Sequence, residues 1–469
     1  MSTTSWPTPQ DLDDLQGDVV LGIPKRNEDF IFFTIQDASS FKVALKALIP
    51  AITTTAQIQK IRKDINEHKR SKAGGLLKCI GINISFSKSG LTKLGITDDL
   101  NDQPFNDGQL KDAEELGDVM TTDANGKPTP KWLDAFKNDI DGVILVAGDS
   151  KLSVAEGVNK VEHVLGSSIK EVLRVEGQVR PGKEKGHEHF GFMDGISNPA
   201  IEALTGHLPG QVVVDSGILI CGTVNDPVQN RPSWAKNGSF LAYRQLQQLV
   251  PEFDKFLTDN PLPGLPRDKG SALLGARLVG RWKSGAPVQL SPVCDDPALA
   301  ADPQRNNNFN YTEGDGINSQ DRCPFSAHVR KTNPRDDLGL TNPALLDHLM
   351  VRQGIPYGPE VTREEADQHT SKHDRGLAFV SYQSSLSKGF EFVQRLWANN
   401  TRFLARPDFP EPGFDPIIGQ LNGAPRETLG TEAGDVNKPL TLPIEFVVPK
   451  GGAYFFTPSI TALKTKLTA

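Results

Sequence analysis

Four short apolar runs, separated by two helical patterns, constrain the fold of the first 180 residues more than any other feature. The runs have the length and apolar content of β-strands, and they lie at Glu28–Ile35, Ile80–Phe86, Gly142–Val146 and Glu171–Glu176. A helical stripe from about Ser40 follows the first run, and a second stripe, Val154 to Leu165, follows the third. The order strand–helix–strand occurs twice in succession, which predicts a ferredoxin-like α+β unit.

The same order returns in the second half of the chain. Phe240–Tyr243 and Leu377–Tyr382 read as strands, and Leu386, Phe390, Val393 and Trp397 form a helical stripe. Two last strands flank Lys450-Gly451-Gly452, which predicts a hairpin turn. We therefore expect two ferredoxin-like domains, each with an antiparallel sheet and peripheral helices. The expected boundaries are 1–205 for the first domain, 206–236 for a connecting segment and 237–469 for the second domain.

Charge and composition narrow the class of protein. The net charge of −7 gives no general surface for nucleic acid or anionic membrane, and no apolar run is long enough to cross a bilayer. The N-terminus lacks the basic and apolar regions of a signal peptide, although a leader removed from a mature protein stays open. Four cysteines lie far apart without a Cys-x-x-Cys pair, which argues against zinc and iron–sulfur sites and leaves disulfides unassigned: Cys79, Cys221, Cys294 and Cys323.

Asp194 lies in the loop Gly191-Phe192-Met193-Asp194-Gly195, close to the expected junction of the two domains. Glycines let a backbone turn tightly, so this acid could face an apolar cavity and act as a base. The pattern alone favours the simpler interpretation, a turn with an exposed aspartate. His187 and His189 nearby suggest a metal site, but solvated loop histidines fit them better.

His328 follows an apolar run and precedes Arg330 and Arg335. A lone histidine in this setting is usually structural. The functional alternative is a metal or haem ligand, with the arginines pairing with anionic groups.

Taken together and in order, several segments resemble the dye-decolorising peroxidases, in particular the longer type found mainly in fungi. The resemblance covers nearly the whole chain, and its segments are 15–18, 191–195, 237–241, 323–335, 351–358 and 376–383. Each segment alone is a weak signal, but their number and order make chance implausible.

The resemblance implies haem b, bound mainly by the C-terminal domain, and a role for each matching residue. His328 would be the axial iron ligand, with Asp415 hydrogen-bonded behind it, and Asp194 and Arg352 would lie on the opposite, peroxide-binding face. Leu377 and Phe379 would flank that pocket. Arg330 and Arg335 are candidates to pair with the haem propionates, with surface charge as the alternative.

The expected activity is oxidation of bulky aromatic dyes or phenolics by hydrogen peroxide. Asp194 would move a proton between the peroxide oxygens, and Arg352 would stabilise the developing negative charge. A haem-handling protein with little turnover is the first alternative, and a non-haem hydrolase using Asp194 is the second. The resemblance also implies secretion. The oligomeric state, the physiological reductant and manganese oxidation stay open.

Trp397 and Tyr357 match positions where family members carry radical-forming aromatics. A haem enclosed between two domains admits peroxide but hardly a polycyclic dye, so electrons would leave through an oxidisable side chain near the surface. Trp397 precedes the polar pair Asn399-Asn400, which predicts that it lies at the exposed end of its helix. Packing is the alternative role for both residues.

Overall fold

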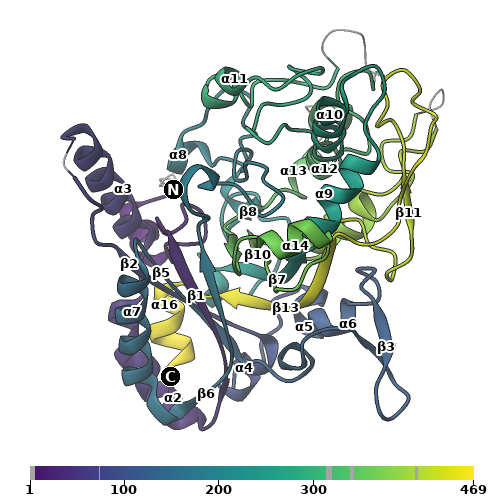
Figure 1. The fold of residues 1–469 in the computed structure, drawn as a ribbon. Helices are drawn as coiled ribbons and strands as arrows, with labels where there is room; N and C mark the ends of the chain where they lie inside the picture. The colour runs from purple at the N-terminus through teal and green to yellow at the C-terminus, as the bar shows by residue number, and fades with distance from the viewer. Residues whose placement is uncertain (1–5, 73, 313–319, 339–342, 407–409) are drawn as a thin grey trace.

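Nine strands form one antiparallel sheet in the computed structural model, which describes residues 6–72, 74–312, 320–338, 343–406 and 410–469 (Figure 1). Two small hairpin sheets lie outside it, namely β3 (Met120–Thr122) with β4 (Pro128–Pro130) and β11 (Arg426–Thr428) with β12 (Leu440–Leu442).

The N-terminal half of the sheet has the strand order β2-β5-β1-β6. Its strands are β1 (Asn27–Ile35), β2 (Ile80–Phe86), β5 (Gly142–Gly148) and β6 (Ile169–Gln178). Helices α2 (Ala38–Leu48) and α7 (Lys151–Leu165) pack against each other on one face of this half (Figure 1). Two strand–helix–strand units with the first and third strands in the centre make the ferredoxin-like pattern, as the sequence predicts.

The C-terminal half repeats this arrangement, so the prediction of two ferredoxin-like units is confirmed. Its strands are β7 (Ser239–Gln248), β8 (Val351–Arg352), β9 (Ile355–Tyr357), β10 (Gly376–Gln383) and β13 (Val447–Thr457). β7 and β10 are central, with β13 beside β7, and with β8 and β9 beside β10. The pairings β13–β2 and β6–β9 join the two halves into a ring of strands.

The first strand, β1, explains why its sequence is an unbroken apolar run. Phe30 and Phe32 point into the ring and contact Tyr243 of the other half, with ring centroids 5.3 and 4.8 Å apart. Phe33 points the other way and packs on Phe41 of α2. A strand that is buried on both faces needs apolar side chains at consecutive positions.

The remaining helices surround the ring. In the N-terminal half and the connection they are α1 (Pro9–Asp14), α3 (Thr55–Arg70), α4 (Lys88–Lys93), α5 (Gln103–Asp107), α6 (Gln109–Asp112) and α8 (Glu202–Thr205). The C-terminal half adds α9 (Val250–Asp259), α10 (Arg267–Val279), α11 (Pro297–Ala301), α12 (His328–Thr332), α13 (Pro343–Leu346), α14 (Arg363–Gln368), α15 (Phe390–Phe392), the π-helix η8 (Val393–Ala398), α16 (Ile460–Ala462) and the π-helix η9 (Leu463–Leu467).

The hairpin predicted at Lys450-Gly451-Gly452 is wrong, because β13 continues through these residues. The pairing register with β7 shifts between Pro449 and Gly451, which marks a β-bulge. Gly451 has φ +149°, and a Cβ there would lie 2.1 Å from the Phe136 ring. The glycine therefore serves a bulge and a close contact rather than a turn.

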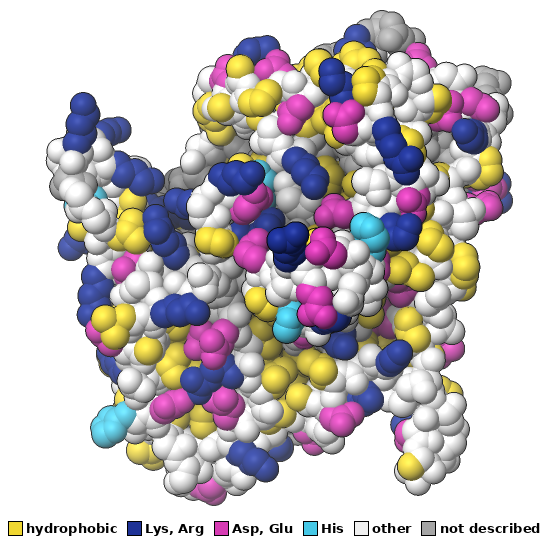
Figure 2. Space-filling model, in the orientation of Figure 1, with side chains coloured by type: hydrophobic (Ala, Val, Ile, Leu, Met, Phe, Trp, Pro, Cys, Tyr) yellow, Lys and Arg dark blue, Asp and Glu magenta, His cyan; other side chains and the backbone are white. Residues whose placement is uncertain are grey.

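The surface carries both signs of charge. Figure 2 shows Lys and Arg intermixed with Asp and Glu on the face in view. No helix in the described ranges is long and apolar enough to cross a membrane. All four cysteines are unpaired, and three of them are buried.

Candidate active site

A cavity lies against the outer face of the C-terminal half of the sheet. Alternate residues of three neighbouring strands line it, as expected where one strand face is exposed to a cavity: Arg244, Leu246, Gln248, Leu377, Phe379, Val447 and Pro449. The intervening residues Ala378 and Val380 belong to the core of the ring. The loop around Asp194, helix α12 and the π-helix η8 supply the other walls.

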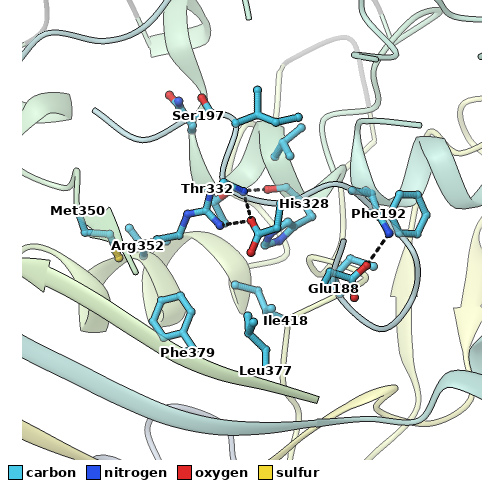
Figure 3. A pocket seen from close by; sticks show the side chains of 18 of the residues that line it. Glu188, Phe192, Ser197, His328, Thr332, Met350, Arg352, Leu377, Phe379 and Ile418 are labelled. Carbon is cyan, nitrogen blue, oxygen red and sulfur yellow. Dashed lines mark hydrogen bonds and ion pairs between the residues drawn. The ribbon is translucent and has the colours of Figure 1, made fainter. Parts of the chain in front are cut away.

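The loop that carries Asp194 is folded around the half-buried carboxylate of Glu188. Its two oxygens accept hydrogen bonds from the backbone N–H groups of Phe190 and Phe192, both at 2.8 Å, and from the side chain of Gln248 (Figure 3). The Asp194 N–H donates to Gly186 O at 3.0 Å. These bonds fix the direction of the loop before it reaches Asp194.

Asp194 forms an ion pair with Arg352 across the cavity wall. Arg352 Nη1 lies 2.7 Å from Asp194 Oδ1, and both side chains are about one-third exposed (Figure 3). The Gly195 N–H donates to the same carboxylate oxygen at 2.6 Å. Asn198 holds the backbone of Arg352 from both sides, accepting from its N–H at 3.1 Å and donating to its C=O at 3.0 Å. The Asp194 loop and strand β8 are therefore held together.

The surroundings of Asp194 lower its pKa. Burial acts most strongly and would raise the pKa, but the positive charge and hydrogen bond of Arg352 and the Gly195 N–H outweigh it. The carboxyl group therefore stays ionised in moderate acid and is available to accept a proton there.

His328, the first residue of α12, lines the same cavity. Its Nδ1 lies 2.9 Å from Oδ2 of Asp415, which is fully buried. The other oxygen of Asp415 accepts from the backbone N–H groups of Ile417 and Ile418 at 2.8 and 3.0 Å. With Nδ1 donating to this carboxylate, Nε2 keeps its lone pair and is the ring nitrogen left for a ligand bond.

Burial alone would raise the pKa of Asp415, but His328 and the two backbone donors lower it below its ordinary value. The group behind the imidazole is therefore a carboxylate at neutral pH. An imidazole oriented in this way is a typical ligand of iron.

Comparison with known proteins gives the family. Residues 14–181 match the model of the DyP dimeric alpha+beta barrel domain, and residues 186–405 match the model of the Dyp-type peroxidase C-terminal domain. A dye-decolorizing peroxidase of Auricularia auricula-judae is 45% identical over 466 residues, which cover 97% of this chain and 87% of that protein. The solved structure of an ancestral D-type dye decolorizing peroxidase is 52% identical, with a TM-score of 0.92, and the match covers 98% of this chain and 100% of that one.

The chain belongs to the DyP-type peroxidase family.

A more distant relative bears a different name. A deferrochelatase of Yersinia pseudotuberculosis is 26% identical over 336 residues, which cover 69% of this chain and 56% of that protein.

DyP-type peroxidases are haem proteins, and the cavity fits such a group. Two buried arginines, Arg281 and Arg335, line it. Both guanidinium groups lie over the Phe309 ring, at 5.6 and 3.9 Å, and both donate to the side-chain oxygen of Asn307. Within the described residues neither forms an ion pair with a carboxylate. Buried cations without counter-ions favour an anionic ligand, and haem carries two propionates.

Arg330, the other predicted propionate partner of this DyP-type protein, lies elsewhere. Its guanidinium is fully buried in a two-point ion pair with Asp337, at 2.7 and 2.8 Å, and stacks on Phe325 and Tyr311. It does not line the cavity. As the third residue of α12, Arg330 points into the protein and has a structural role there.

The predicted exposure of Trp397 is wrong. Only 3% of this residue is exposed, because its indole stacks on Phe403 at 5.0 Å and meets His348 and Phe392 edge-on. Lys331 of α12 donates to Trp397 O at 3.2 Å, which ties the helix of His328 to η8.

Tyr357 is also buried, at 6% exposure, and its hydroxyl donates to Asp374 at 3.0 Å. Neither aromatic lines the cavity.

His189 is buried, so the expectation of a solvated loop histidine is wrong for this residue. Its Nε2 lies 2.9 Å from Tyr357 O, and burial lowers its pKa to about 4. In the described residues no three His, Cys, Asp or Glu side chains group as a metal site would require.

Three site residues were missed by sequence reasoning, namely Glu188, Asn198 and Arg281. Glu188 and Asn198 flank Asp194, and their polar side chains within an otherwise glycine-rich and apolar loop were the available signal. Arg281 follows the apolar positions of α10 and gave no signal that separates it from a surface arginine.

Proposed function

We propose that this protein is a haem b peroxidase that uses hydrogen peroxide to oxidise bulky aromatic compounds such as anthraquinone-type dyes and phenolics. The observation that carries the proposal is the Asp194–Arg352 ion pair, which faces the same cavity as a histidine backed by a buried carboxylate. The family and the named peroxidases among its relatives support it.

In this proposal His328 Nε2 holds the haem iron, and Arg335 and Arg281 face the propionates. Haem iron, when bound, supplies a Lewis acid for peroxide and accepts its oxidising equivalents. Leu377 and Phe379 of strand β10 make their part of the cavity wall apolar, which excludes water from the reacting oxygens.

The proton chemistry falls to Asp194. Its ionised carboxylate accepts a proton from one peroxide oxygen and returns it to the other, so that the second oxygen leaves as water. Arg352 carries a cationic guanidinium beside this carboxylate. It therefore orients Asp194 and stabilises negative charge that develops as the O–O bond breaks.

Asp415 acts behind the ligand. A buried carboxylate that accepts from Nδ1 fixes the tautomer of His328 and makes Nε2 a stronger electron donor. Stronger donation favours O–O cleavage over reversible binding of oxygen.

Haem handling without efficient turnover is the second candidate, and the name of the Yersinia relative favours considering it. Haem binding needs His328 and the cavity, but it gives no role to Asp194, which forms an ion pair with Arg352 in the same cavity. The Asp194–Arg352 pair and the nearer relationship to named peroxidases support the peroxidase.

The test uses the haem-loaded protein. We expect a Soret band, and steady-state oxidation of an anthraquinone dye that requires hydrogen peroxide. A Soret band without peroxide-dependent dye oxidation would favour haem handling. Absence of haem binding would overturn both candidates and return Asp194 to the hydrolase interpretation.

We also propose that the protein is secreted, in keeping with its resemblance to the fungal enzymes. Detection of the protein in the medium of the producing organism tests this, and its retention inside the cells would contradict it.

A further inference from the structure

Met350 places an oxidisable sulfur in the wall of the cavity. The sequence has only four methionines, Met1, Met120, Met193 and Met350, of which the last three fall in the described residues. Met350 directly precedes strand β8, two positions before Arg352. Figure 3 shows both side chains entering the cavity.

The contacts of Met350 are apolar and lie on two sides. Towards the sheet it joins the same hydrophobic cluster as Phe379, which also lines the cavity. Away from the sheet it packs against the small cluster of Leu345, Val393 and Trp397. The side chain is half-buried, so its thioether is reachable from the cavity while its neighbours hold it in place.

We propose that Met350 is the site at which this enzyme oxygenates itself when peroxide is present without an aromatic reductant. The inference rests on the proposed peroxidase function. The thioether sulfur loses two electrons and gains one oxygen atom from peroxide, forming a sulfoxide. Peroxide is reduced by the same two electrons, and its other oxygen leaves as water with both peroxide protons. No further oxidant is required.

The product would change the cavity wall. Methionine sulfoxide is polar, whereas the groups around Met350 are the apolar side chains of Leu345, Val393 and Trp397. An unpaired polar oxygen among such groups is unfavourable, so the wall between the cavity and Trp397 should rearrange. Oxidation at this residue therefore couples a lack of reductant to loss of activity.

Met120 is a matched internal control. It is also half-buried, but it lies in hairpin strand β3 and does not line the cavity. Free peroxide in solution should therefore oxidise Met350 and Met120 at comparable rates, whereas peroxide activated in the cavity should reach Met350 and not Met120. Met193 also lines the cavity, and its peptide should be oxidised less than that of Met350.

Peptide mass spectrometry of the haem-loaded protein tests the proposal. After treatment with excess hydrogen peroxide, we expect several-fold more sulfoxide in the Met350 peptide than in the Met120 peptide. Addition of dye should suppress oxidation of Met350 and leave Met120 unchanged, because the reductant competes only for peroxide activated in the cavity. Comparable oxidation of both peptides, or no protection of Met350 by dye, would overturn the proposal.

A pair of variants completes the test. Leucine has nearly the volume of methionine but no sulfur, so Met350→Leu should survive peroxide without dye several-fold longer than the parent, whereas Met120→Leu should decay like the parent. An unchanged lifetime of Met350→Leu would contradict a role for its sulfoxide in inactivation.

Dye oxidation measured at the start of the same experiment distinguishes a failure of the peroxidase proposal from a failure of the Met350 proposal. If dye is oxidised but Met350 is not modified ahead of Met120, only the self-oxygenation proposal fails. If no dye is oxidised, the peroxidase proposal fails first.

Discussion

Arg352 and Asp194 are 158 residues apart in the chain, yet Arg352 Nη1 and Asp194 Oδ1 lie 2.7 Å from each other. One residue follows the N-terminal half of the sheet and the other is in strand β8 of the C-terminal half. Their distance is therefore set by how the two halves pack, and Asn198 keeps the two backbones in register.

Removal of Arg352 should move the acid limb of the peroxide reaction to higher pH. Arg352 lowers the pKa of Asp194 against burial, which raises it, so the parent keeps an ionised base as the pH falls below the ordinary aspartate value near ~3.9. In Arg352→Gln burial is no longer opposed by this charge, and the carboxyl group should protonate at higher pH. The check is the pH profile of the rate of reaction with peroxide, with the exposed Arg363→Gln as control. An acid limb that stays in place in Arg352→Gln would mean that another group titrates.

Replacement of Asp415 should weaken both the fold and haem retention. Asp415→Asn leaves a buried site without its carboxylate, which should lower the free energy of unfolding at neutral pH by roughly 1–3 kcal/mol. The folded pKa of Asp415 is lowered, so its stabilising effect is present above the ordinary aspartate pKa and is lost as pH falls through the lowered value. The deficit of the variant relative to the parent should therefore shrink in strong acid. Chemical denaturation at several pH values and the Soret band measure these effects, and a constant deficit across the acid range would contradict them.

Glu188 should affect the reaction only through the loop that it holds. In Glu188→Gln the new NH₂ group must face a backbone N–H group that now donates to the carboxylate. Two donors cannot bond each other, so the loop should shift. A displacement of this kind near the reacting atoms should slow the reaction with peroxide by about 10- to 100-fold. The acid limb should stay near that of the parent, because Asp194 still does the proton transfer. Glu184→Gln, in the same loop region, is the control. A normal rate in Glu188→Gln would show that the loop does not depend on this carboxylate.

Trp397 should carry electrons from the haem although it is buried. Its indole stacks on Phe403, which is half-exposed, and its backbone is tied to the helix of His328 through Lys331. Trp397→Phe should lower turnover of bulky dyes while leaving small phenols and the reaction with peroxide nearly unaffected, and adding Tyr357→Phe should lower it further. Electron paramagnetic resonance should detect a peroxide-derived radical on Trp397 in the parent and in the control Trp234→Phe. Equal losses for dyes and small phenols, with no such radical, would leave Trp397 a packing residue.

The sequence predicted the architecture because the pattern of apolar residues in each strand and helix shows which of its faces are buried. The apolar run Phe30 to Phe33 indicates a strand that is buried on both faces, and the helical stripes indicate helices that are buried on one face. The order of these strands and helices was enough to predict two ferredoxin-like units. The bulge at Gly451 was misread because a glycine in close contact with Phe136 has the same local sequence as a glycine in a turn.

Long-range packing set the features that local pattern could not predict. Trp397 is covered by Phe403 of the following loop, so polar neighbours in sequence did not make it exposed. Arg330 and Arg335 are five positions apart in the same segment, but only Arg335 lines the cavity. Local pattern raised Asp194 and His328 only as candidates beside common structural interpretations, and their roles, like the choice of Arg352, came from the family resemblance.

The most direct test of the central claim is a stopped-flow measurement of the Soret change when haem-loaded Asp194→Asn meets hydrogen peroxide. Asparagine nearly preserves the shape of Asp194 but cannot accept the proton, so the rate should fall at least about 10²-fold relative to the parent. Asp254→Asn changes a carboxylate outside the cavity lining and should react like the parent. A parental rate in Asp194→Asn would contradict the claim that this carboxylate activates peroxide.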